Sequence, residues 1–120
     1  MRDPTRGGLA TTLNEFIEDT EQGIELQETQ IPVSPAVQTV CDMLGLDPLY
    51  CACEGRLIAV VSQECKEKAL RILRENPYTE HAACIGTVTE DHPGRLVLRT
   101  AFGGGRILTK LTGNQLPRIC

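Results

Sequence analysis

The sequence predicts an α+β fold in which a mixed or antiparallel sheet carries helices packed on one face and ends in a flexible C-terminal tail. Segments of helical periodicity alternate with strand-like segments along the chain. Start and stop signals separate them. The 120 residues, 41% of them hydrophobic, are enough for one core but not for several. The domain is expected to span residues 1–111 and the tail residues 112–120.

The first expected element is an amphipathic helix from Gly7 to about Thr20. Its apolar residues recur at helical spacing, namely Leu9, Leu13, Phe16 and Ile17. Residues 23–33, GIELQETQIPV, then alternate between apolar and polar side chains. Such alternation is typical of a strand with one buried face, where we expect Ile24 and Leu26.

The second expected helix has clear signals at both ends. Ser34 is a favourable N-cap residue, Pro35 suits the first helical position, and Gly45 is a typical stop. The buried stripe of this helix is expected to consist of Val37, Val40, Cys41 and Leu44.

Residues 49–61, LYCACEGRLIAVV, are interpreted as two strands around a turn at Glu54-Gly55. The second strand is almost entirely apolar, which is typical of a central position in a sheet. A third helix is expected in residues 63–76, ending at Asn76-Pro77. Its inward residues are expected to be Ala69, Leu70 and Leu73.

The last part of the chain predicts paired strands. Residues 82–91 and 94–102 are interpreted as a hairpin across His92-Pro93-Gly94. The three glycines at 103–105 form a flexible tip, and residues 106–111 give a last short strand. No periodicity follows Leu111.

Composition excludes several functions. A net charge of −4 and 3% aromatic residues offer no basic, stacking surface for nucleic acid. No apolar run approaches the length of a membrane span, and the start lacks the pattern of a signal peptide, so a cytoplasmic location is expected. Because the start lacks an export signal and the Gly/Pro loop content is low, the six cysteines are expected to be reduced thiols. They form no C-x-x-C pair, which argues against a metal site. Cys41 and Cys84 are interpreted as small buried hydrophobes.

The opening MRDPTRGG leads directly into the first helix, so its backbone amides face a helix N-terminus that stabilises anions. Arg2 and Arg6 add positive charge, and Asp3 can hold a metal ion or orient an arginine. The alternative is a capping turn with its own salt bridge.

Two further residues are candidates for chemistry. Glu54 can act as a general base if apolar walls raise its pKa, or it is simply an exposed charge at a turn. Cys120 is the last residue, behind Pro117, Arg118 and Ile119. An accessible thiol on a mobile tail suits a nucleophile or group carrier as well as it suits an inert thiol.

Three stretches together resemble one family: MRDPTRGGLATTLNE at the start, LDPLY running into CEGRL at residues 46–57, and the terminal PRIC. They resemble the C-terminal domain of the hydrogenase expression/formation proteins that act as carbamoyl dehydratases in NiFe-hydrogenase maturation. That family belongs to the aminoimidazole ribonucleotide synthetase-like superfamily. The resemblance covers essentially all 120 residues, and DPTRGG together with PRIC is highly specific. The family usually has asparagine where this chain has Cys53. If that asparagine helps to hold the substrate amide, this chain must position the amide differently.

The resemblance implies a mechanism. A partner carbamoyltransferase places a carbamoyl group on Cys120, which gives an S-carboxamide. ATP activates the amide oxygen by phosphorylation, and loss of phosphate and a proton leaves a thiocyanate. The cyano group then passes to iron in a scaffold of two further maturation proteins. Glu54 would be the base. Asp3, Thr5, Arg6 and Gly7 would line the phosphate end of the site for ATP with Mg.

The family's ATP-binding and dimer-forming domain precedes this segment. The chain is therefore expected to be a fragment that folds but does not turn over alone, as a monomer or weak pair, although the full-length protein is expected to be a homodimer. Two alternatives remain open. One is a carrier or docking module that presents Cys120 to maturation partners, and the other is a small-molecule phosphotransferase of the same superfamily.

Overall fold

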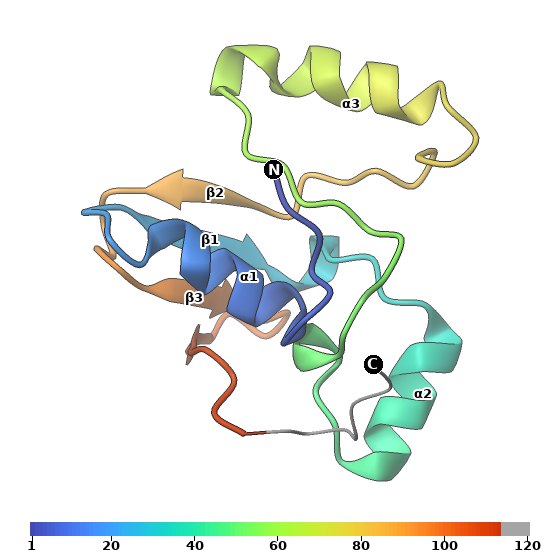
Figure 1. Cartoon of the computed structure of the whole chain (residues 1–120), viewed down its shortest axis with the longest axis vertical. Helices are drawn as coiled ribbons and strands as arrows, with labels where there is room; N and C mark the ends of the chain where they lie inside the picture. The colour runs from blue at the N-terminus through green and yellow to red at the C-terminus, as the bar shows by residue number, and fades with distance from the viewer. Residues whose placement is uncertain (114–120) are drawn as a thin grey trace.

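The computed structural model describes residues 1–113 and confirms the α+β class. Three α-helices and four strands make up the fold (Figure 1). They are α1 (Gly8–Ile17), β1 (Gly23–Gln27), α2 (Pro35–Leu44), α3 (Lys66–Arg74), β2 (Gly86–Thr89), β3 (Leu96–Arg99) and β4 (Gly105–Leu108). Short 3-10 turns are η1 (Glu28–Gln30), η2 (Pro48–Tyr50) and η3 (Gln63–Cys65).

The four strands form one mixed sheet in the order β2-β1-β3-β4. Strand β1 pairs antiparallel with β2 and parallel with β3. The predicted hairpin across His92-Pro93-Gly94 is therefore wrong, because β1 lies between its two strands. The segment that separates β2 from β3 instead crosses the end of β1, where the Gly94 amide donates to the Gln22 carbonyl oxygen at 2.9 Å.

The true hairpin joins β3 to β4, which pair antiparallel. Its tip contains the three glycines, and the Thr100 amide donates to the Gly104 carbonyl oxygen at 2.8 Å. Gly103 has a φ of 86°, in the left-handed region that favours glycine. The predicted glycine tip and final short strand are thus confirmed.

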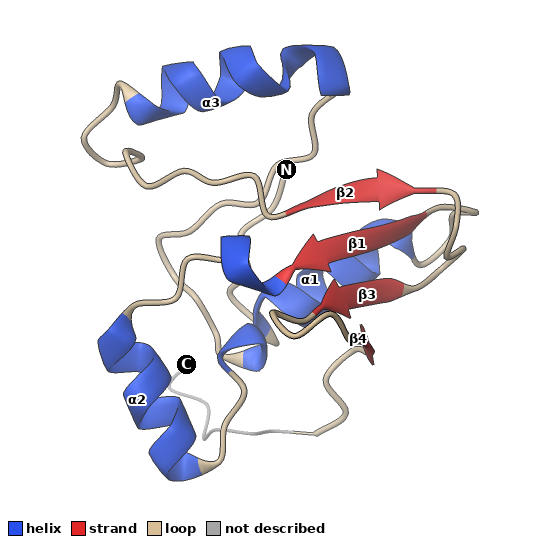
Figure 2. Cartoon of the chain, turned by 180° about the vertical axis from the view of Figure 1, so that it is seen from behind, coloured by secondary structure: helices blue, strands red, loops and turns tan. Residues whose placement is uncertain are grey.

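Helix α1 covers one face of the sheet, and no helix within residues 1–113 packs on the opposite face (Figures 1 and 2). Ile24 and Leu26 point toward α1 and are buried, as the alternation predicts. The core between helix and sheet consists mainly of Ala10, Leu13, Ile17, Ile24, Leu26, Leu96, Leu98 and Leu108. The Asn14 side-chain amide links the two layers by donating to the Leu108 carbonyl oxygen at 3.0 Å.

Helix α2 has the predicted ends but not the predicted buried face. Ser34 Oγ accepts from the Val37 amide, and Gly45 ends the helix with a φ of 67°. Cys41 is the one buried residue of the helix. The rest of the expected stripe is exposed: Val37, Val40 and Leu44. The reason is that α2 packs against η2 and not against the sheet.

The two strands expected in residues 49–61 do not form. Pro48–Tyr50 is a 3-10 turn, for which the Asp47 carboxylate accepts from the Leu49 amide at 2.9 Å. Of the apolar run that follows, only Ile58 makes a β-bridge, and its partner is Arg2. The central place expected for this run belongs to β1, and Val60 and Val61 are about half exposed.

Helix α3 stands away from the sheet, connected by two extended segments (Figure 1). None of its residues is buried, so the prediction that Ala69, Leu70 and Leu73 face the core is wrong. The helix packs chiefly on its own leading turn, η3. Within residues 1–113, no helix combines the length and the apolar character that crossing a membrane requires.

Candidate functional site

The segment before α1 presents a helix N-terminus that no side chain caps. Gly7 is the N-cap residue, with a φ of 68°, and its carbonyl oxygen accepts from the Thr11 amide. The first amides of a helix have no partner inside the helix, and they carry the positive end of its dipole. This start of α1 is therefore suited to hold an anion, as the DPTRGG sequence predicts.

Gly8 fixes the loop that lies across this helix start. Its φ is 64°, and a Cβ atom there would lie only 2.5 Å from the Leu49 carbonyl oxygen and 2.6 Å from that of Cys51. The chain from Leu49 to Cys51 thus passes directly over the first turn of α1. The sequence analysis did not single out Gly8, although the paired glycines were the available signal.

The other residues predicted in the opening segment lie close together on the surface. Thr5 Oγ1 donates to the Asp3 carboxylate at 2.8 Å. Arg2 forms an ion pair with Glu15, so the salt bridge of the segment does not involve Asp3. Arg6 is exposed, and within residues 1–113 it forms no ion pair. Its guanidinium is available to an anion.

Two backbone contacts bring Glu54 beside this segment. The Cys53 amide donates to the Pro4 carbonyl oxygen at 3.0 Å. Arg2 and Ile58 exchange both of their backbone hydrogen bonds, at 3.0 and 2.8 Å. Glu54 lies between these contacts, at a turn in which Gly55 has a φ of 70°. The structure therefore brings together Glu54 and the segment from Asp3 to Gly7, which are distant in sequence.

Glu54 itself is exposed at the tip of the turn. Among the described residues, its carboxylate has no hydrogen-bond or ion-pair partner, and no apolar wall encloses it. A hollow of about 550 Å³ lies elsewhere, between α2, η2 and β4, and none of the predicted site residues lines it. Within residues 1–113, Glu54 therefore lies on an open surface and not in an enclosed pocket.

Two cysteines, Cys51 and Cys53, come just before Glu54 in the chain, and Cys41 of α2 lies beside Cys51. Burial raises the pKa of Cys51 to about 11, and the neighbouring Cys41 acts in the same direction. Burial also raises the pKa of Cys53, against the opposing effect of Arg56. The Cys53 thiol donates to the Cys51 carbonyl oxygen at 3.3 Å. At neutral pH both thiols are protonated, so neither is an activated nucleophile.

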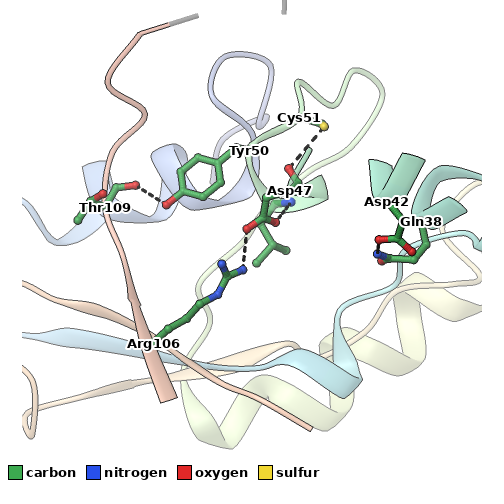
Figure 3. A network of polar contacts seen from close by, with 8 residues as sticks. Gln38, Asp42, Asp47, Tyr50, Cys51, Arg106 and Thr109 are labelled. Carbon is green, nitrogen blue, oxygen red and sulfur yellow. Dashed lines mark hydrogen bonds and ion pairs between the residues drawn. The ribbon is translucent and has the colours of Figure 1, made fainter. Parts of the chain in front are cut away.

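Polar contacts hold residues 47–50, which lead into the Glu54 loop, against β4 and the segment after it (Figure 3). Asp47, which caps η2, pairs with Arg106 at 2.6 Å between Oδ2 and Nη2. The Tyr50 hydroxyl donates to the Thr109 carbonyl oxygen at 3.0 Å. The sequence analysis missed these positioning residues, because their partners are more than fifty residues away.

The predicted acceptor Cys120 lies outside the described residues, as do Pro117, Arg118 and Ile119. In the part of the chain that the structure describes, no group of three or more metal-ligating side chains comes together. Cys41 is buried, as predicted, whereas Cys84 is only half-buried.

Residues 1–99 match a family described as AIR synthase related protein, C-terminal domain. The chain is 49% identical over 120 residues to the carbamoyl dehydratase HypE of Bradyrhizobium diazoefficiens and 42% identical to that of Escherichia coli. Each alignment covers all of this chain and 35% of the relative. The chain therefore spans about a third of the length of the curated relatives it matches.

Solved structures give the same result. The chain is similar to hydrogenase maturation protein HypE in complex with ATP, with a TM-score of 0.90 and 50% identity over 99% of this chain and 37% of that one. It is also similar to a HypE-HypF complex, with a TM-score of 0.85 and 35% identity over 92% of this chain and 35% of that one.

Proposed function

The chain belongs to the family described as AIR synthase related protein, C-terminal domain. On this premise, we propose that it is the C-terminal part of an ATP-dependent carbamoyl dehydratase of hydrogenase maturation. The proposal rests on one contact above all. The hydrogen bond between Cys53 and Pro4 joins the Glu54 turn to the DPTRGG segment, in a chain 49% identical to carbamoyl dehydratase HypE.

The proposed reaction takes place on the chain's own last residue. Cys120 receives a carbamoyl group as an S-carboxamide, and dehydration converts that amide into a thiocyanate, the source of a cyanide ligand for the NiFe-hydrogenase iron. An amide oxygen is a poor leaving group, and its conversion into phosphate makes the loss favourable, which accounts for the use of ATP. A base must then remove protons from the amide nitrogen.

Glu54 is the residue we assign as that base. The backbone hydrogen bond from Cys53 to Pro4, which joins the turn of Glu54 to the DPTRGG segment, supports this assignment. Its exposure in residues 1–113 means that this part of the chain does not exclude water from it. A base of this kind acts best in a dry site, so we propose that the preceding domain of the longer protein supplies the opposite wall.

The segment from Asp3 to Gly7 fits the phosphates of ATP. The start of α1 has no side-chain cap, and Arg6 has no ion-pair partner within residues 1–113. Asp3 offers a carboxylate of the kind that holds Mg²⁺ together with phosphate oxygens. When bound, ATP supplies the phosphoryl group that activates the amide oxygen. The residues of this chain would hold one end of it, and the rest of the nucleotide would contact the preceding domain.

The proposed partners follow from the same reaction. A carbamoyltransferase must deliver the carbamoyl group to Cys120, and one structural relative is a HypE-HypF complex. An iron scaffold of further maturation proteins would receive the cyano group. We propose that the longer protein is a homodimer through its preceding domain and that the 120-residue chain is a monomer or weak pair, with residues 112–120 serving as the tail.

Intact-mass spectrometry of the longer protein tests the proposal. After incubation with the partner carbamoyltransferase, carbamoyl phosphate and ATP, we expect a carbamoyl adduct followed by the loss of one water. Cys120→Ala should acquire neither change. A carrier that only presents Cys120 would gain the adduct and never lose water, and a small-molecule phosphotransferase would keep its activity without Cys120. The 120-residue chain alone is expected not to dehydrate the carboxamide. ATP-dependent dehydration by this chain alone would contradict the proposal that the reaction needs the preceding domain.

A further inference from the structure

Two thiols lie side by side, one on α2 and the other in the loop that leads to Glu54. Cys41 Sγ, on α2, lies 3.9 Å from Cys51 Sγ, directly after η2. A disulfide has its sulfur atoms about 2 Å apart, so a side-chain movement of roughly 2 Å would join them. Both cysteines are free in the structure.

This contact is central to how α2 is attached. Cys41 is the one buried residue of the helix, and α2 packs against η2, the turn that precedes Cys51. The large apolar side chains Val40, Met43 and Leu44 are exposed. The attachment of α2 to the rest of the domain therefore centres on the two sulfur atoms.

Cys51 also contacts the residues around the candidate site. Its carbonyl oxygen lies against Gly8 at the start of α1 and accepts from the Cys53 thiol. Its own thiol donates to the Asp47 carbonyl oxygen at 3.6 Å (Figure 3). A constraint placed on Cys51 would therefore act on the loop that holds Glu54 beside Pro4.

We propose that Cys41 and Cys51 are a reversible disulfide site, whose oxidation by a small-molecule disulfide such as oxidised glutathione fastens α2 to the Glu54 loop. The half-buried Cys51 reacts first, because Cys41 is only 4% exposed. The Cys51 thiolate attacks one sulfur of the small disulfide and releases one thiol. The Cys41 thiolate then attacks the Cys51 sulfur of this mixed disulfide and releases the second thiol. The two cysteines are oxidised, the small disulfide is reduced, and the two protons end on the released thiols.

The geometry selects this pair over the other three thiols of residues 1–113. Cys53 is near in sequence, but its thiol is directed at the Cys51 carbonyl oxygen. Cys84 donates to the Gly86 carbonyl oxygen beside β2, and Cys65 is exposed on η3. The proposal does not depend on the carbamoyl dehydratase assignment, since it requires only the two sulfur atoms and an external disulfide.

Peptide mapping of the 120-residue chain under non-reducing conditions tests the site. The chain is incubated with oxidised glutathione at mildly alkaline pH, because burial and then the neighbouring Cys41, Cys53 and Asp47 all disfavour the Cys51 thiolate. We expect a cross-linked peptide that joins Cys41 to Cys51 and disappears with dithiothreitol. Hydrogen exchange in α2 should slow several-fold in the oxidised form.

Matched serine variants separate this pair from general thiol oxidation. Cys51→Ser should abolish the cross-link, whereas Cys65→Ser, which removes an exposed thiol on η3, should leave it unchanged. Far-UV circular dichroism establishes that both variants fold. A lasting glutathione adduct on Cys51 with no cross-link would overturn the proposal. So would a disulfide that joins Cys51 to Cys53 or Cys84.

Discussion

The Cys53 amide donates a hydrogen bond to the Pro4 carbonyl oxygen at 3.0 Å. Cys53 directly precedes Glu54, and Pro4 is the second residue of the DPTRGG segment. Together with the two backbone hydrogen bonds between Arg2 and Ile58, this contact joins the two predicted parts of the site within the chain itself. This relation suits a site whose base and phosphate end have to act on one small group.

Glu54→Gln in the longer protein should separate the two steps of the proposed reaction. Carbamoylation of Cys120 should be unaffected, because it depends on the partner enzyme, whereas the rate of water loss should fall at least ~100-fold without the base. Time-resolved intact-mass spectrometry measures both steps. Glu64→Gln, an exposed glutamate on η3, is the matched control and should keep both rates. Equal dehydration rates in Glu54→Gln and wild type would exclude Glu54 as the base.

Gly8→Ala should be strongly destabilising, because the new methyl group would meet the backbone of residues 49–51 at less than 3 Å. We expect a loss of roughly 2–4 kcal/mol in the free energy of unfolding, or failure to fold. Gly45→Ala is the matched control, since its φ of 67° is similar and nothing lies within 4 Å of its Cβ position. It should cost only the backbone strain of about 1–2 kcal/mol. Urea unfolding compares the two, and equal losses would mean that the loop can move away from α1.

The exposure of α2 predicts a contrast between two leucines. Leu44 is 63% exposed, whereas Leu98 is fully buried between α1 and the sheet. Leu98→Ala should cost about 2–5 kcal/mol in the free energy of unfolding, as a cavity in a core does. Leu44→Ala should change it by less than about 0.5 kcal/mol. A large effect of Leu44→Ala, with the chain monomeric by sedimentation, would show that α2 packs in solution on a surface other than η2.

The raised pKa of Cys51 predicts how stability depends on pH. The folded chain holds this proton up to a pKa of about 11, whereas an ordinary thiol releases it near 9.0. Between these values the folded state binds more protons than the unfolded state, so stability should fall as the pH rises from about 9 toward 11. Urea unfolding at about pH 8 and about pH 10.5, under reducing conditions, measures the fall. Cys51→Ser should show a smaller fall, and an unchanged pH dependence in that variant would contradict the assignment to Cys51.

The sequence predicted elements that depend on local signals. The start of α1, the cap at Ser34, the stop at Gly45 and the two faces of β1 all follow from residues within one or two turns of each other. Strand partners are not local. Nothing in the run from Leu96 to Arg99 indicates that its neighbour is a strand seventy residues earlier and not the adjacent β2.

The incorrect predictions of burial have a related cause. An apolar stripe on α2 and an apolar run at residues 57–61 have the same pattern whether or not another element covers them, and here Leu44 and Val60 remain exposed. The candidate site was likewise found through a resemblance and not through spacing. The contact between Pro4 and Cys53 depends on how the loop crosses α1 at Gly8, which no periodicity encodes.

The place of β1 inside the sheet also sets the order of events during synthesis. Its two neighbours are β2 and β3, so residues 23–27 have no strand to pair with until the ribosome has made residues 86–99. Until those residues are made, the apolar face of α1 lacks the sheet that covers it in the folded chain. Pairing between segments so distant in sequence is slow, because a long loop must close before any contact forms. Formation of this sheet is therefore expected to be the slow step in the folding of the domain.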